Sequence, residues 1–145
     1  MNRDMSIIED AIATIRASLE DNPDIIDACI NIINYLIIET ENKSHLTFWN
    51  LYEASLSENP STVIKSVYFL ADTKMDILQQ KFEVLDPKTN RLEEVPSNEV
   101  VETLISKDFA HPITGQELTE REYKNIVTPF FCPSDRLLEG DIRHE

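Results

Sequence analysis

Glycine is almost absent from this sequence, with two residues among 145. Glycine supplies positive-φ turns and the phosphate-cradling loops of nucleotide-binding folds. Its scarcity therefore excludes a Rossmann or P-loop nucleotide site, and also a β-sandwich with many glycine hairpins. Long apolar runs are lacking as well. The longest, residues 25–38, contains Asp27, Asn31 and Asn34 and is shorter than the ~20 residues that a bilayer requires.

Cysteine and histidine are scarce too. Cys29 lies in an apolar stretch and is expected to be a small core residue, while Cys132 is distant from it in sequence. No signal peptide is visible, so a reducing cytoplasmic location is expected. None of His45, His111 and His144 has partners at zinc-ligand spacing. We therefore expect no metal and no other cofactor.

Catalytic groups are hard to identify in such a sequence. A nucleophilic pair of Cys132 with a histidine is formally possible, but the sequence shows no base and orienting group around the thiol. Adjacent carboxylates such as Glu93-Glu94 are common in so acidic a chain and do not indicate acid–base catalysis. The expectation is a protein that is not an enzyme.

Basic residues are outnumbered about two to one, with 13 Lys and Arg against 27 Asp and Glu, for a net charge of −14. Such a chain repels phosphate backbones and attracts basic surfaces. The charge is uneven: residues 1–42 carry −7, residues 43–90 carry −1 and residues 91–145 carry −6. Binding to nucleic acid or membrane is therefore disfavoured, and a larger protein with a basic surface is the expected partner.

Hydrophobic residues make up 41% of the chain, which is enough for one folded core. Apolar positions spaced by three and four, together with capping signals, predict helices. The first begins at a capping box formed by Ser6 and Glu9. The others cover residues 25–38, 47–56 and 60–78, and the last of these is one helix or two helices separated near residues 72–73.

The periodicity changes after residue 80. Alternating charged and apolar residues around a turn at residues 86–90 predict a β-hairpin over residues 81–95. A short helix follows, then a turn or small hairpin over residues 111–118. Thr119 and Glu122 form a capping box that opens a helix to residue 127. The expected fold is mainly α (α+β), a helical bundle with a small hairpin and a short helical C-terminal extension. We expect one domain over residues 1–128 and an irregular acidic tail over residues 129–145.

The order of elements over residues 24–95, three helices and then a hairpin, resembles the winged-helix arrangement. This resemblance implies a third helix that enters a DNA groove and a wing that touches phosphates. The basic residues available for that role are Lys65, Lys74, Lys81, Lys88 and Arg91. Acidic residues are interleaved with them, which is more simply explained by a solvated surface, and the fold alone does not determine function.

Aromatic residues provide candidate binding surfaces. Phe48, Trp49 and Tyr52 are crowded on one short helix, so part of this set could be exposed, although packing of all three under neighbouring helices is the simpler interpretation. Phe130-Phe131 lies between two prolines and outside any predicted element, so it is a second candidate docking patch. Aromatic side chains are frequent at interface hot spots. The candidate partner-binding residues are Trp49, Tyr52, Phe130, Phe131, Glu93 and Glu94.

The leading functional hypothesis is a non-enzymatic, acidic protein–protein interaction module. It would act as an accessory subunit, adaptor or inhibitor of a larger and more basic partner. Immunity proteins, antitoxins and accessory subunits of bacterial or phage conflict systems share this charge and size. Two alternatives stay open: a DNA mimic that occupies a nucleic-acid-binding groove, and a winged-helix DNA-binding regulator.

Overall fold

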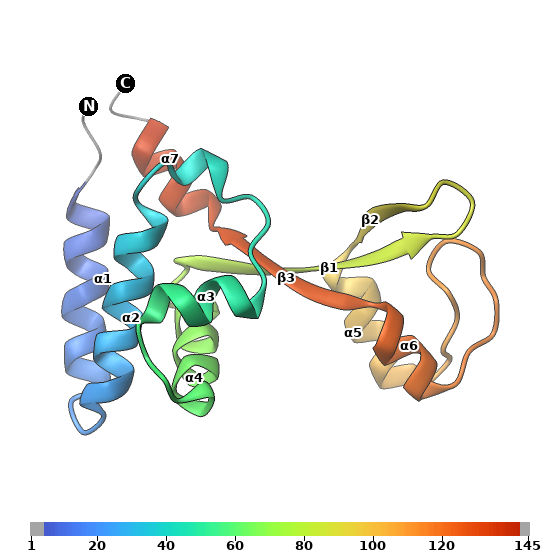
Figure 1. Ribbon diagram of the computed structural model, residues 1–145, viewed down its shortest axis with the longest axis horizontal. Coiled ribbons are helices and arrows are strands. Elements are labelled where there is room, and N and C mark those ends of the chain that lie inside the picture. Colours follow the sequence, from blue (N-terminus) through green and yellow to red (C-terminus); the bar gives the residue numbers. More distant parts are fainter. Residues whose placement is uncertain (1–4, 143–145) are drawn as a thin grey trace. The chain divides into compact units, whose positions relative to one another are not determined.

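Seven α-helices, one 3₁₀ helix and a three-stranded sheet make up the part of the chain that the computed structural model describes, residues 5–142, with side chains described for residues 6–139. The predicted α+β class, with helices and a small hairpin, is confirmed. The sheet has the strand order β2-β1-β3. The elements, shown in Figure 1, are α1 (Met5–Ser18), α2 (Pro23–Leu36), η1 (Thr40–Asn42), α3 (Phe48–Ser55), α4 (Pro60–Ala71), β1 (Leu78–Asp86), β2 (Arg91–Val95), α5 (Ser97–Ser106), α6 (Glu120–Ile126), β3 (Thr128–Pro133) and α7 (Asp135–Ile142).

The described chain divides into two compact units. The first, here called the helical unit, contains residues 5–79 and 131–142, and the second unit contains residues 80–130. Both boundaries fall inside strands, β1 and β3. Each unit has a hydrophobic core of its own. The expected single domain over residues 1–128 stays a prediction, because a division into compact units does not decide the number of domains.

Helix α2 is the centre of the helical unit. It contacts α1 on one side and α3 and α4 on the other (Figure 1). Ile32, Ile33 and Leu36 of α2 are fully buried, as expected for a helix that is apolar around most of its circumference. Cys29 is buried among them, so the prediction that it is a core residue is confirmed.

The second unit consists of a hairpin and two helices. Strands β1 and β2 pair antiparallel, with Phe82 opposite Val95 and Leu85 opposite Leu92. Its core contains the buried residues Val84, Val95, Val100, Phe109, Tyr123 and Val127. The capping box predicted for α6 is present, because the Thr119 hydroxyl accepts from the Glu122 amide at 3.1 Å and the Glu122 carboxylate accepts from the Thr119 amide at 2.8 Å.

Several boundaries differ from the sequence prediction. Helix α1 already includes Met5, so Ser6 lies inside it and does not cap it. Helix α4 ends at Ala71, where Asp72 becomes extended, and Leu78 belongs to a strand and not to a longer helix. The winged-helix-like segment 24–95 does not form one compact unit, because the hairpin from Gln80 onward belongs to the second unit.

The segment after residue 128 is ordered where it was expected to be irregular. Residues 128–133 form β3 and residues 135–142 form α7, while residues 143–145 lie outside the described part. Phe131 exchanges two backbone hydrogen bonds of 2.7 Å with Leu46, and its side chain is fully buried. Strand β3 also lies beside β1 in the sheet, so its regular structure depends on partners far away in the sequence.

Candidate functional site

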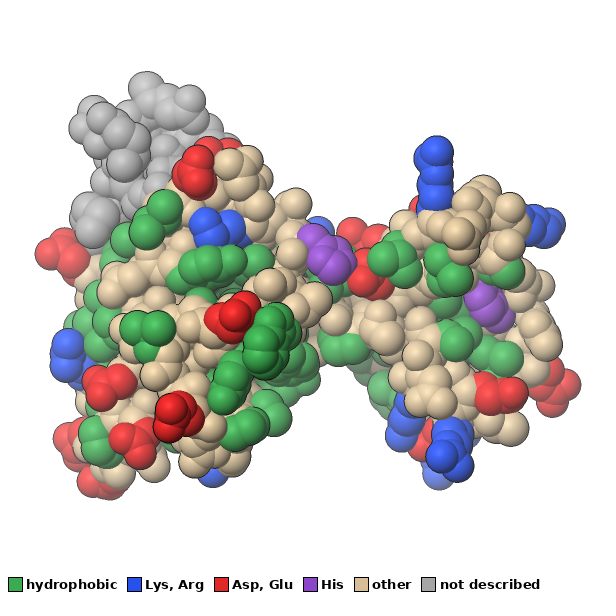
Figure 2. All heavy atoms as spheres, viewed as in Figure 1, with side chains coloured by type: hydrophobic (Ala, Val, Ile, Leu, Met, Phe, Trp, Pro, Cys, Tyr) green, Lys and Arg blue, Asp and Glu red, His purple; other side chains and the backbone are tan. Residues whose placement is uncertain are grey.

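A hollow of about 710 Å³ lies between α3 and α4 of the helical unit. We call it the aromatic groove, and its lining is almost entirely apolar. Figure 2 shows hydrophobic side chains gathered over this region of the helical unit, with acidic side chains nearby. The groove is lined by Phe48, Trp49, Tyr52, Pro60, Val63, Ile64 and Tyr68.

Local sequence signals set the orientation of the groove walls. Thr47 caps α3 in a reciprocal capping box: its hydroxyl accepts from the Asn50 amide at 3.2 Å, and the Asn50 side chain accepts from the Thr47 amide at 2.9 Å. Asn59 caps α4 by accepting from the Ser61 amide at 3.0 Å, and Pro60 occupies the first helical position. These caps fix the residue at which each helix starts, and therefore which aromatic side chains face the groove.

Contacts between aromatic rings support the floor and one wall of the groove. The Phe48 ring meets the buried Phe131 ring edge to face, with centroids 4.9 Å apart, and the Tyr68 ring lies 6.4 Å from Phe131. Trp49 stacks on Tyr52 at 5.6 Å with an interplanar angle of 22°. Such ring pairs are worth about 0.5–1.5 kcal/mol each beyond the area that they bury. The groove therefore has a packed floor.

The rim of the groove is open to solvent. Trp49 is 63% exposed, and Ile64 and Tyr68 are each 47% exposed. Single exposed apolar side chains are common in folded proteins, whereas large contiguous apolar surfaces are typical of interaction sites. The groove is thus a candidate binding site of the helical unit.

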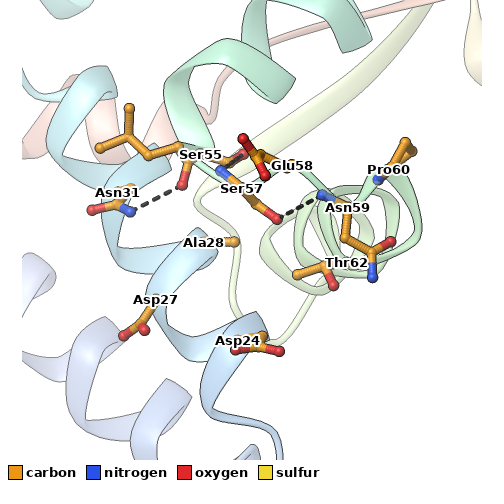
Figure 3. Close-up of a pocket in the computed structure, with 11 residues that line it drawn as sticks. Asp24, Asp27, Ala28, Asn31, Ser55, Ser57, Glu58, Asn59, Pro60 and Thr62 are labelled. Atoms are coloured by element: carbon orange, nitrogen blue, oxygen red, sulfur yellow. Dashed lines mark hydrogen bonds between the residues drawn. The ribbon is translucent and has the colours of Figure 1, made fainter.

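A second, polar hollow of about 650 Å³ lies in the same unit, between α2 and the start of α4 (Figure 3). We call it the acidic hollow because three exposed carboxylates line it, from Asp24 and Asp27 of α2 and from Glu58 before α4. No basic side chain is among its lining residues in the described part of the chain. The remaining lining residues are Ala28, Asn31, Ser55, Leu56, Ser57, Asn59, Pro60 and Thr62.

Hydrogen bonds order the wall of the acidic hollow. The Asn31 side-chain amide donates to the Ser55 carbonyl at 2.9 Å, which joins α2 to the end of α3. The Ser57 hydroxyl accepts from the Asn59 amide at 3.2 Å (Figure 3). The loop that carries Glu58 is therefore held by contacts on both sides.

The structure separates the sequence-predicted binding residues. Trp49 and Tyr52 both line the aromatic groove, while Phe130 and Phe131 are buried in β3 and provide no docking patch. The expectation of a docking patch was wrong, because Phe131 belongs to the core of the helical unit and the Phe130 side chain is only 7% exposed. Glu93 and Glu94 are exposed on β2, and Glu94 forms an ion pair of 3.8 Å with Lys81.

The basic residues considered for nucleic acid do not gather in one unit. Lys65 and Lys74 belong to the helical unit, whereas Lys81, Lys88 and Arg91 belong to the second unit. The pairing of Lys81 with Glu94 offsets one of these charges. Neither unit on its own therefore presents a cluster of these five residues.

Sequence reasoning missed Pro60, Val63, Ile64 and Tyr68 as groove residues. The signal was present, because Ile64 and Tyr68 lie four residues apart on one apolar stripe of α4. That stripe was used only to predict a helix. The structure covers only part of it and leaves the Ile64 and Tyr68 side chains half exposed.

Among the described residues, there is little support for a nucleophilic cysteine or a metal site. Burial raises the pKa of the Cys29 thiol to about 11, although a hydrogen bond with the Ser66 side chain opposes this shift. A thiol with so high a pKa is a poor nucleophile. Between residues 5 and 142, no three His, Cys, Asp or Glu side chains form a group that could hold a metal ion. None of the helices in this range combines the length and apolar content that crossing a bilayer requires.

The fold and the site define an α+β protein whose helical unit carries an exposed aromatic groove beside an acidic hollow. No protein-family model matches the chain, and neither a curated protein nor a solved structure is significantly similar to it.

Proposed function

We propose that this protein is a non-enzymatic, acidic protein-binding module. It works as an accessory subunit, adaptor or inhibitor that binds a larger and more basic protein through the helical unit. The observation that carries the proposal is the aromatic groove between α3 and α4, with Trp49 exposed at its rim. Trp and Tyr side chains that are exposed in the free protein are typical anchors of protein interfaces.

The charge supports a basic protein as the partner. Residues 1–79 and 131–145 contain 17 acidic and 7 basic residues, a net charge of −10, while residues 80–130 contain 10 and 6, a net charge of −4. The unit that carries the groove is therefore the more acidic one. Its field accelerates association with a positively charged surface, and salt weakens this effect.

Cross-linking in the cell of origin tests the proposal. A photo-crosslinking amino acid placed at position 64, on the groove rim, is expected to capture a basic protein. The same amino acid at position 38 is the control, because Ile38 is also exposed, at 62%, but does not line the groove. The captured protein is then purified for binding measurements.

Binding of the purified partner provides the decisive measurement. Ile64→Glu places a charge in the apolar contact and is expected to weaken binding at least about tenfold, whereas Ile38→Glu leaves it unchanged. The association rate is expected to fall between low and high salt. Equal binding by both variants, or an association rate that ignores salt, would contradict the proposal.

A further inference from the structure

The acidic hollow and the aromatic groove adjoin each other. Pro60 lines both of them. The hydroxyl of Tyr52, in the groove, donates a hydrogen bond of 3.2 Å to the backbone carbonyl of Glu58, in the wall of the hollow. A ligand that extends past the Glu58–Pro60 segment therefore meets aromatic rings on one side and carboxylates on the other.

The charge of the hollow stays negative after the helix dipoles are counted. Asp24 lies in the first turn of α2, and Glu58 directly precedes the Asn59 cap of α4. Each helix N-terminus is equivalent to roughly +0.5 elementary charge, so two termini offset about one of three carboxylates. About two negative charges remain, and no basic lining residue in the described part neutralises them. The hollow therefore favours a cationic group.

We propose that groove and hollow together bind one segment of a partner protein. In this segment a bulky apolar side chain, Leu, Ile, Met or aromatic, enters the groove, and a neighbouring Lys or Arg enters the hollow. The inference rests on the proposed function and adds the chemistry of the partner. Arg suits the hollow best, because its guanidinium presents several donors and the lining offers carboxylates together with the polar side chains of Asn31 and Ser57.

Other occupants fit the two hollows less well. A second copy of the chain is disfavoured, because two helical units of net charge −10 repel each other. A nucleic acid is repelled by the same carboxylates. A small ligand buries most of its surface in its pocket, whereas the rim of this groove is open at Trp49, Ile64 and Tyr68.

Trp49 gives a direct readout of the groove, because it is the only tryptophan of the chain. The experiment selects a random 16-residue peptide library, displayed on phage, against the full-length protein. Enriched peptides that lack tryptophan are then synthesised. Their binding is followed by the emission of Trp49 in the wild-type protein and in variants whose folding is checked by circular dichroism.

Two matched pairs of variants separate the contributions. Ile64→Glu disrupts the groove, and Ile38→Glu is its control. Asp24→Asn, Asp27→Asn and Glu58→Gln together neutralise the hollow. Their control neutralises three exposed carboxylates of the same unit outside both hollows, with the changes Glu9→Gln, Glu20→Gln and Asp21→Asn.

The expected result is that enriched peptides carry an apolar residue and a Lys or Arg at constant spacing. Ile64→Glu is expected to weaken their binding at least about tenfold. The triple change in the hollow is expected to weaken it about three- to tenfold, and the control triple less than about twofold. Peptides in which Gln replaces the basic residue should bind the hollow triple variant and the control triple variant with equal affinity.

Three results overturn the inference. In the first, apolar peptides without a basic residue bind equally well, and their affinity is the same for the wild-type protein and for the variant with Asp24→Asn, Asp27→Asn and Glu58→Gln. The hollow is then not part of the site, while the proposed function stands. If no enriched peptide changes the Trp49 emission, the two hollows do not bind a peptide segment, and the cross-linking at position 64 decides the proposed function separately. If the Trp49 emission changes with protein concentration alone, the occupant is a second copy.

Discussion

Cys29 shows how burial changes the chemistry of a single residue. It lies on the inner face of α2, fully buried, and its thiol donates a weak hydrogen bond of 3.8 Å to the Ser66 carbonyl. Burial disfavours the charged thiolate and raises the pKa to about 11 from an ordinary value of 9.0. The side chain therefore contributes to packing while it stays protonated.

We predict that this thiol destabilises the protein at alkaline pH. Because the folded pKa is raised, the unfolded chain releases the proton first, so the stability contribution is complete below pH 9 and is lost as the pH rises toward 11. The loss reaches about 1 kcal/mol at pH 10. Urea unfolding at pH 7, 9 and 10 measures it. Cys29→Ala should lack this component, so a constant difference between the two proteins across this range would contradict the prediction.

Two helices end at residues other than glycine in the left-handed backbone conformation. Helices α3 and α5 both end on a residue in the left-handed conformation, Leu56 with φ 59° and Lys107 with φ 63°. Glycine is the common residue at such positions, because an L side chain is strained there. The two helices therefore end with strain that glycine would relieve.

Leu56→Gly is therefore expected to stabilise the protein by about 0.5–1 kcal/mol. The Leu56 side chain is 80% exposed, so its removal costs little packing. Leu56→Ala is the control, since it removes the same side chain but keeps an L residue at positive φ. Chemical denaturation of the three proteins checks the order. A glycine variant no more stable than the alanine variant would show that the end of α3 is not strained.

Local signals predicted the helices better than the strands. The caps at Thr47, Asn59 and Thr119 act within three residues, so the starts of α3, α4 and α6 could be found from the sequence. Strand β3 could not, because it pairs with β1 in the sheet and Phe131 also bonds Leu46, contacts that no local pattern encodes. The same limit applies to the tail that was expected to be irregular.

The candidate site was half predictable for a similar reason. Trp49 and Tyr52 were identified because three aromatic residues crowd one short helix. The exposure of Ile64 and Tyr68 depends on how much of α4 is buried by neighbouring elements. The spacing of apolar residues in the sequence does not predict this burial. Asp24, Asp27 and Glu58 likewise line one hollow only because α2 packs beside the loop before α4.

At the scale of the whole molecule, the larger unit carries most of the excess negative charge, roughly in proportion to its size. The net charge is −10 over residues 1–79 and 131–145, and −4 over residues 80–130. The ion pairs Lys81–Glu94 and Lys124–Glu120 both lie in the second unit. Self-repulsion in a compact state opposes folding, and it weighs most on the helical unit, which carries the candidate site.

Moderate salt is therefore expected to stabilise the protein. Sodium chloride shortens the screening length from about 30 Å at 0.01 M to about 8 Å at 0.15 M, which weakens repulsion between carboxylates more than it affects buried contacts. We expect Tm to rise by about 2–5 °C over this range in thermal unfolding followed by circular dichroism. The variant with Glu9→Gln, Glu20→Gln and Asp21→Asn should start at a higher Tm and respond less to salt. A Tm that falls with salt would mean that attractive ion pairs, and not self-repulsion, dominate the electrostatics of the fold.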